Sequence, residues 1–190
     1  MTVLKSTFVA FFFCLASTMY CLGQEEKPLS TDRSCRKFVQ EFYSWYAAKA
    51  AKERQEMAGD LPLKYRSDLF SSAIVQGIRE VDEAQKVAGS DLISFDVDPF
   101  VGADGIAKKY IVERASVTNN RCMAEVHAVW DGKEDQAPDV ISETVIENGK
   151  WTFVNFYFPS PSNPKGWDLL GALKAFREGE KKKPKKVNKQ

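Results

Sequence analysis

The stretch that decides the fold class of this chain is Val140-Ile-Ser-Glu-Thr-Val-Ile-Glu-Asn-Gly-Lys-Trp-Thr-Phe-Val-Asn-Phe-Tyr-Phe158. Asn148-Gly149 separates two runs rich in β-branched and aromatic residues, and this dipeptide favours the two-residue turn of a β-hairpin. Folding the runs about the turn places Glu147 opposite Lys150, Ile146 opposite Trp151, Thr144 opposite Phe153 and Val140 opposite Tyr157. Charge pairs and aromatic to β-branched pairs stabilise antiparallel strands. The stretch therefore predicts an antiparallel sheet.

A second hairpin is expected just upstream of this one. Residues 110–117 and 122–130 are both β-rich, and Asn119-Asn120 lies between them as turn material. Residues 92–95 are also strand-like. Downstream, Pro159, Pro161 and Pro164 predict the end of the last strand, because proline cannot donate a ladder hydrogen bond.

Two helices are predicted before the sheet and a short one after it. Residues 34–57 contain no proline or glycine and repeat large side chains at helical spacing. A second such pattern covers residues 67–87, and a third covers about 167–177. The first stripe comprises Phe38, Phe42, Trp45 and Lys49 with Val39 and Tyr46 beside them, and the second Phe70, Ile74, Ile78, Val81 and Gln85. Because each helix is polar on its other side, we expect an α+β domain with N-terminal helices packed on a curved antiparallel sheet.

Four segments carry a family resemblance: the helix Cys35 to Tyr46, Ile93-Ser-Phe-Asp-Val-Asp-Pro-Phe100, Gly149-Lys-Trp-Thr-Phe153 and the leucine-bearing C-terminal segment. Together they resemble bacterial domain-of-unknown-function family 3828, which is similar to the nuclear-transport-factor-2-like cone fold. The resemblance covers most of residues 34–176. It implies a cone-shaped α+β fold and an exported setting, and it assigns no activity, since cone folds host isomerases, dehydratases, ligand binders and interaction modules.

The N-terminal residues predict a secretory signal. Lys5 precedes an apolar run over residues 8–22, and a polar segment follows. A positive start, a short apolar run and small residues before a polar break are typical of signal peptides, whereas a membrane span needs a longer run. We expect a signal peptide over residues 1–23 with cleavage between Gly23 and Gln24, a polar lead-in over 24–33, and a protein exported to the periplasm or the medium.

The charge distribution separates a folded domain over 34–176 from a basic tail over 177–190. The tail holds seven basic and two acidic residues, whereas residues 24–176 hold 19 basic and 24 acidic side chains, a net charge of −5. A basic run with a proline and no aromatic residue predicts a disordered, solvated tail. If the tail has a function, we expect weak contact with an anionic surface. Because the body is acidic, nucleic acid is excluded as a partner.

Cysteine usage bears on both redox state and metal binding. Cys35 and Cys122 are the two cysteines beyond the signal, and outside the cytosol such a pair is more often bonded than free. A bridge would contribute roughly 4 to 5 kcal/mol in the chain-entropy model. The sequence leaves open whether the two meet. One histidine and two distant cysteines lack the paired spacing of a zinc site, so we expect no metal and no cofactor.

Three aspartates near residue 100 suggest a calcium loop, but their spacing fails the known template. Counting from Asp96, the sixth position is Val101 instead of glycine, and the twelfth is Ala107 instead of glutamate. We therefore interpret Asp98-Pro99 as a structural turn, with Phe100 filling the core. A weak, irregular cation site that would include Asp104 is the alternative.

The only histidine, His127, provides the candidate catalytic site. If Asn119-Asn120 forms a two-residue turn, Arg114 lies opposite Glu125 and Val112 opposite His127. Glu125 and His127 then share a sheet face, where they would form an acid/base pair with Arg114 as the cationic orienting group. Because alternation does not say which face is buried, the competing interpretation is a solvated ion pair beside a surface histidine. We favour that second interpretation.

The candidate binding residues are six aromatic side chains that could line an apolar pocket between helix and sheet: Trp45, Tyr46, Trp130, Trp151, Phe153 and Tyr157. They serve equally well as core residues. We expect a non-catalytic exported domain that binds a small apolar molecule or an envelope protein, with a homodimer as one assembly. The alternatives are a cone-fold hydrolase, isomerase or dehydratase using Glu125 and His127, and a secreted inhibitor or immunity-like protein.

Overall fold

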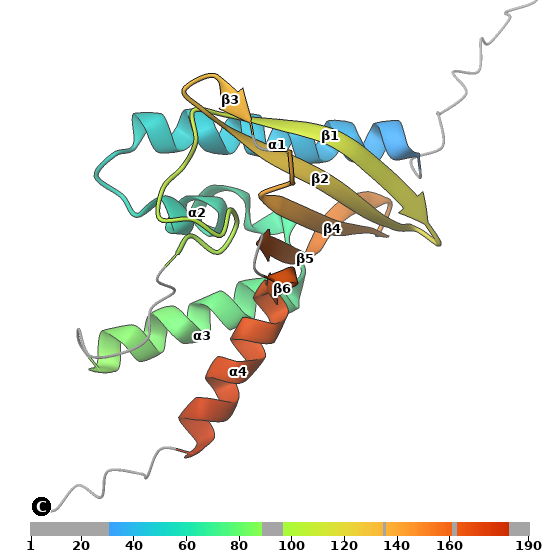
Figure 1. The fold of residues 1–190 in the computed structure, drawn as a ribbon. Coiled ribbons are helices and arrows are strands. Elements are labelled where there is room, and N and C mark those ends of the chain that lie inside the picture. Colours follow the sequence, from blue (N-terminus) through green and yellow to red (C-terminus); the bar gives the residue numbers. More distant parts are fainter. Residues whose placement is uncertain (1–30, 89–96, 135, 161–162, 183–190) are drawn as a thin grey trace, which may run out of the picture.

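The computed structural model describes residues 31–88, 97–134, 136–160 and 163–182 (Figure 1). It has the predicted α+β architecture, with helices first, then an antiparallel sheet and a C-terminal helix. In chain order the elements are α1 (Asp32–Lys52), η1 (Ala58–Asp60), α2 (Leu61–Arg66), η2 (Ser67–Leu69), α3 (Ser72–Ala88), β1 (Lys109–Thr118), β2 (Arg121–Trp130), β3 (Lys133–Glu134), β4 (Val140–Glu147), β5 (Lys150–Ser160), β6 (Asn163–Asp168) and α4 (Leu169–Lys182).

The sheet is antiparallel with strand order β1-β2-β4-β5-β6, and the short β3 pairs with the end of β2. Both predicted two-residue turns are present. Asn119 and Asn120 have φ of 51° and 61°, and Asn148 and Gly149 have φ of 51° and 75°, which are the left-handed values that this turn requires. Turn chemistry therefore determines how these two pairs of strands are joined.

The predicted register is right near each turn and wrong beyond a β-bulge. In the β4–β5 pair, Glu147 faces Lys150, Ile146 faces Trp151 and Thr144 faces Phe153, as predicted. An extra residue in β5 then shifts the pairing, so Tyr157 faces Ile141 instead of Val140. A bulge places two residues of one strand opposite one of its partner, and turn chemistry does not predict its position.

Helix α1 covers the β1–β2 part of the sheet (Figure 1). Thr31 caps its N-terminus, since its side chain accepts a hydrogen bond from the Ser34 amide, and the Ser34 hydroxyl oxygen accepts one from the Thr31 amide. The helix ends at Lys52, five residues before the expected end. Its buried face comprises Cys35, Val39, Phe42, Tyr43, Tyr46 and Ala47. This face is rotated about the helix axis relative to the predicted stripe, and Lys49 lies outside it.

Side chains of α1 also close the free edge of β1. The Gln40 side chain accepts a hydrogen bond from the Val112 amide and donates one to the Tyr110 carbonyl oxygen. The Arg36 Nε donates to the Val112 carbonyl oxygen, and the Asp32 carboxylate accepts from the Val117 amide. An edge strand with unpaired backbone groups invites pairing with another chain. Here α1 satisfies several of those groups.

The space between α1 and the sheet is filled by aromatic rings. Phe42 lies at its centre, with ring centroids of Phe153 at 4.9 Å, Phe70 at 5.6 Å and Phe100 at 6.3 Å. These four side chains are at most 5% exposed. Among the described residues, the space between α1 and the sheet is therefore occupied by closely packed aromatic side chains.

A disulfide between Cys35 and Cys122 joins α1 to β2, with the two Cα atoms 6.5 Å apart. The residues are separated by 87 positions in the sequence, so the bridge closes a long loop of the unfolded chain. It also places Cys122 on the sheet face that α1 covers. Alternation then puts Ala124 and Val126 on that same face and Glu125 and His127 on the opposite one.

The C-terminal part differs from the prediction in two ways. Proline does not end the strand at residue 159: β5 continues to Ser160, and β6 follows with Pro164 inside it, which an edge strand tolerates. Helix α4 starts at Leu169 and continues to Lys182, so residues 177–182 are helical instead of disordered. It packs on α3, where a Cβ on Gly77 would meet the Leu173 side chain at 2.6 Å.

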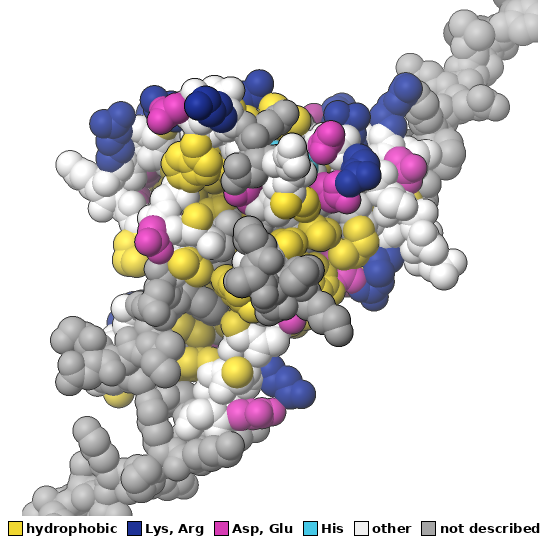
Figure 2. Space-filling view, in the orientation of Figure 1, with side chains coloured by type: hydrophobic (Ala, Val, Ile, Leu, Met, Phe, Trp, Pro, Cys, Tyr) yellow, Lys and Arg dark blue, Asp and Glu magenta, His cyan; other side chains and the backbone are white. Residues whose placement is uncertain are grey.

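The predicted signal peptide with its Gly23–Gln24 cleavage site, the strand-like residues 92–95 and the last eight tail residues lie outside the described residues. Within the described residues, no helix combines the length and the apolar character needed to cross a bilayer. On the face drawn in Figure 2, acidic and basic side chains are mixed along the upper rim, and hydrophobic side chains gather nearer the centre.

Candidate functional site

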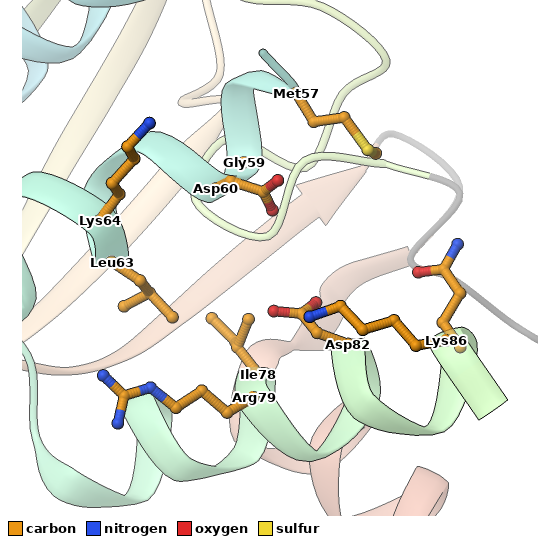
Figure 3. A pocket seen from close by; sticks show the side chains of 10 residues that line it. Met57, Gly59, Asp60, Leu63, Lys64, Ile78, Arg79, Asp82 and Lys86 are labelled. Atoms are coloured by element: carbon orange, nitrogen blue, oxygen red, sulfur yellow. The ribbon is translucent and has the colours of Figure 1, made fainter.

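The first candidate site is a groove between the η1–α2 segment and α3, called the helix groove below (Figure 3). It has a volume of about 570 Å³ and is lined by Met57, Gly59, Asp60, Leu63, Lys64, Ile78, Arg79, Asp82, Gln85 and Lys86. Ile78 is buried and Met57 is 69% exposed, so apolar side chains form both its floor and its rim. In Figure 3 the carboxylates of Asp60 and Asp82 reach into the gap from opposite walls.

A second hollow of about 340 Å³ continues the helix groove toward the loop before β1. The two share Met57, Gly59, Asp60, Ile78, Asp82 and Gln85. The loop adds Asp98 and Asp104 together with the apolar side chains Val97, Pro99 and Ile106. Apolar surface, four aspartates from η1, α3 and the loop, and the basic side chains Lys64, Arg79 and Lys86 thus line one continuous depression.

Asp98 is the most perturbed carboxyl group in this depression. Its Oδ2 accepts a hydrogen bond from the Tyr46 hydroxyl, and its Oδ1 accepts one from the Phe100 amide at 2.9 Å. Burial raises the pKa of Asp98 to about 6, although these hydrogen bonds act in the opposite direction. Burial and the neighbouring Asp98 also raise the pKa of Tyr46. Asp98 therefore changes charge near neutral pH.

The charge of Asp60 acts on the carboxyl groups of Asp82 and Asp98. Burial, followed by the charge of Asp60, raises the pKa of Asp82, and Lys86 acts in the opposite direction. Asp60 also contributes to the raised pKa of Asp98. Carboxylates that share a partly dry space repel one another, so a cation placed between them would be stabilised.

The predicted turn at Asp98-Pro99 is confirmed. The Asp98 carbonyl oxygen accepts hydrogen bonds from the Val101 and Gly102 amides, and Phe100 is fully buried, as expected of a residue that fills the core. Asp96, the first residue of the rejected calcium loop, lies outside the described residues. Asp98 and Asp104 belong to no cluster of close metal-ligating atoms among the described residues.

The second candidate site lies on the sheet face opposite α1 and comprises Glu113, Arg114, Glu125 and His127. The Arg114 Nε donates to the Glu125 Oε2 at 2.8 Å, which confirms the predicted cross-strand pair. The His127 Nε2 lies 3.2 Å from the Glu113 Oε2. One ligating atom from each of Glu113, Glu125 and His127 lies within 4.8 Å of the other two.

Two predictions about this second site are wrong. His127 is only 3% exposed, so it is not a surface histidine. It lies opposite Ile111 instead of Val112, because a bulge in β1 inserts an extra residue between Val112 and Ala115. Glu113 and Arg114 are both set opposite Glu125 by the bulge, and bulges redirect side chains in this way. This is why the sequence did not identify Glu113.

A hollow of about 740 Å³ lies in front of this cluster. Glu113, Arg114 and Glu125 line it, together with Asp32, Arg33 and Arg36 of α1 and with Ala115, Ser116, Met123 and Ile141 of the sheet. His127 is not part of that lining. The two carboxylates therefore border the open space, whereas the buried imidazole does not.

The six aromatic candidates do not line one pocket. Tyr46 and Phe153 are fully buried in the core, and Trp151 is 5% exposed, with its Nε1 donating to the Ser34 hydroxyl. Trp45 is half-buried under the Arg66 guanidinium, Trp130 is 48% exposed at the end of β2, and the Tyr157 hydroxyl donates to the Glu143 carboxylate. Their role in binding a ligand stays a prediction.

The residues of the helix groove were not identified from the sequence. Helical periodicity places Ile78 on the inner stripe of the second helix, and this side chain is buried. The acidic wall could have been suspected only from Asp82, one position after that stripe, and from Gly59-Asp60 at the break between helices. Neither signal shows that the two segments face one another.

No family model, no curated protein and no solved structure gives a significant match to this chain. The resemblance to domain-of-unknown-function family 3828 and to the nuclear-transport-factor-2-like cone fold therefore stays a prediction.

Proposed function

We propose that this protein is an exported, non-catalytic binding domain whose ligand occupies the helix groove and the hollow that continues it. The observation that carries the proposal is the depression itself, which joins apolar side chains to aspartates from η1, α3 and the loop before β1. Binding sites for small molecules are concave and mostly apolar, with a few polar groups that orient the ligand. The groove is concave and combines the apolar side chains Met57, Leu63 and Ile78 with charged side chains of both signs.

The charges favour an apolar molecule that carries a cationic group. Burial is the main cause of the raised pKa values of Asp82 and Asp98. The four aspartates of the two hollows outnumber the basic side chains Lys64, Arg79 and Lys86 by one, so one compensating positive charge is lacking. A cation placed among them would supply that charge, and an apolar body would cover Ile78 and Met57. The proposal thus refines the expected apolar ligand by adding its charge.

The packing of the core supports placing the ligand outside the space between α1 and the sheet. The rings of Phe42, Phe70, Phe100 and Phe153 occupy the space between α1 and the sheet. A ligand there would have to displace core side chains, at a cost of several kcal/mol. Export is proposed from the signal-like N-terminal residues, and the Cys35–Cys122 disulfide is consistent with an oxidising compartment.

A calorimetric titration with three probes tests the proposal: decylammonium, decanoate and ethylammonium, each below its micellar concentration. We expect decylammonium to bind, and decanoate and ethylammonium to bind at least about tenfold more weakly, because each lacks one of the two required features. NMR shift perturbation should place decylammonium at Ile78 and Asp82. Equal binding of decylammonium and decanoate would contradict the proposal.

The double variant Asp60→Asn with Asp82→Asn should weaken decylammonium binding about tenfold, since partly exposed carboxylates each contribute a modest amount. Glu83→Gln is the matched control, because Glu83 is exposed on the same helix and does not line the groove. The control should bind as the wild type does. Unchanged affinity in the double variant would reject the groove as the site.

The enzyme and the inhibitor or immunity-like alternatives stay predictions, as does a homodimer. The enzyme alternative used Glu125 and His127 as an acid/base pair. In the structure the closest carboxylate to the His127 imidazole is that of Glu113, and Glu125 forms an ion pair with Arg114. This arrangement supports a different chemistry for the cluster.

A further inference from the structure

We infer that Glu113, Glu125 and His127 form a binding site for a divalent transition-metal ion on the sheet face opposite α1. The site is independent of the helix groove and shares no lining residue with it. One imidazole nitrogen and two carboxylate oxygens are a donor set that suits Zn²⁺, Mn²⁺ and related ions.

The first support is the convergence of the three side chains from two strands. Glu125 and His127 are two positions apart on β2, so they point to the same face of the sheet. The bulge in β1 brings Glu113 to that face. One ligating atom of each residue lies within 4.8 Å of the other two, a spacing that small side-chain rotations can close around one ion.

The second support is the difference in burial between the ligands. The His127 side chain is 4% exposed, whereas those of Glu125 and Glu113 are 27% and 63% exposed. A buried imidazole on a strand is held in place by its packing, and the more exposed carboxylates have room to adjust to the ion. The immobile ligand is thus already positioned, which lowers the entropic cost of binding.

The third support is access from solvent. The hollow of about 740 Å³ has both glutamates in its wall, and His127 lies within 4.8 Å of them, measured between the ligating atoms. An ion held by the three residues would therefore keep open coordination positions toward the hollow. Three protein ligands and an open position characterise metal sites that bind water or substrate, in contrast to closed structural sites.

Arg114 opposes the ion, and this gives the inference a distinctive test. Its guanidinium donates to the Glu125 carboxylate at 2.8 Å, so it occupies one ligand and repels a cation. The Arg114 side chain is 74% exposed, which allows it to turn toward solvent when an ion binds. We therefore expect an affinity that rises when Arg114 is removed.

The experiment titrates the tag-free, disulfide-bonded protein with ZnCl₂ and MnCl₂ by calorimetry and with CoCl₂ by visible absorption. We expect one ion per chain, with Co²⁺ giving ligand-field bands. Glu113→Gln should weaken binding roughly tenfold or more, and His127→Gln should abolish the Co²⁺ bands. Arg114→Gln should tighten binding several-fold. Glu147→Gln, an exposed glutamate at the end of β4, is the control and should leave binding unchanged.

Glu113 keeps the test decisive even if the buried His127 variant fails to fold, since the Glu113 side chain is 63% exposed and its loss should leave the fold intact. Absence of binding by all three ions would overturn the inference. So would unchanged binding in Glu113→Gln, or Arg114→Gln binding more weakly than the wild type.

Discussion

The two faces of the sheet use opposite means of stabilisation. On the face toward α1, aromatic rings pack on one another, and Phe42, Phe153 and Phe156 are at most 1% exposed. On the opposite face, charged and polar groups pair across strands, as Arg121 and Tyr157 do with Glu143. Apolar packing is non-directional and tolerates small shifts, whereas each pair on the opposite face requires one particular register. Stability should therefore concentrate on the α1 side, and the proposed metal site lies on the other.

The largest expected effect tests the α1 side. Phe42→Ala removes the ring at the centre of the aromatic core, so we expect a loss of about 4 kcal/mol in the free energy of unfolding, measured by urea denaturation. Lys37→Ala is the control, since that side chain is 75% exposed on the same helix, and it should change stability by less than about 0.5 kcal/mol. Similar losses in the two variants would contradict the contrast between the faces.

The second effect concerns Asp98, a carboxyl group on the aromatic side of the molecule. Its pKa is raised to about 6 in the folded protein, so the folded state binds the proton more tightly than the unfolded chain does. Protonation of Asp98 therefore adds its full contribution to the free energy of unfolding below about pH 4. This contribution is lost as pH rises through 6. Asp98→Asn should remove this dependence, which amounts to about 3 kcal/mol at most.

Urea denaturation at pH 4, 5, 6 and 7 measures that slope in the wild type and in Asp98→Asn. The asparagine keeps an oxygen that can accept from the Phe100 amide, so the turn should survive. Asp68→Asn, at an exposed aspartate of η2, should retain the wild-type slope. An unchanged slope in Asp98→Asn would show that another group is responsible.

The smallest effect tests the opposite face. Tyr157→Phe deletes the hydroxyl that donates to the Glu143 carboxylate at 2.8 Å, and Glu143 is only 4% exposed. A hydrogen bond to a buried charged group contributes about 1.5 to 3 kcal/mol, and Arg121 remains as a partner, so we expect about 1.5 kcal/mol. Tyr65→Phe, at a tyrosine that is 44% exposed, should cost less than about 0.5 kcal/mol. A larger loss for Tyr157→Phe than for Phe42→Ala would reverse the comparison.

The fold could be predicted further than the site. Local chemistry predicts the turns at Asn119-Asn120 and Asn148-Gly149 and the burial of Phe100 in the core. All three are present in the structure. Asp131-Gly132, with φ of 49° and 80°, is a comparable turn between β2 and β3 that the same rule would have identified. The helix groove escaped prediction, because its walls are more than ten residues apart and neither carries a motif.

What the sequence determined by itself is local: helical periodicity, two-residue turns, and the pairing of residues close to those turns. These depend on backbone preferences and on neighbours a few positions away. Only the tertiary structure decided the meeting of Cys35 with Cys122, the burial of His127 and the placement of Glu113 beside it. Each depends on a bulge or on a packing contact between distant segments. These contacts stabilise the protein only when segments that are distant in the sequence have come together in the folded chain.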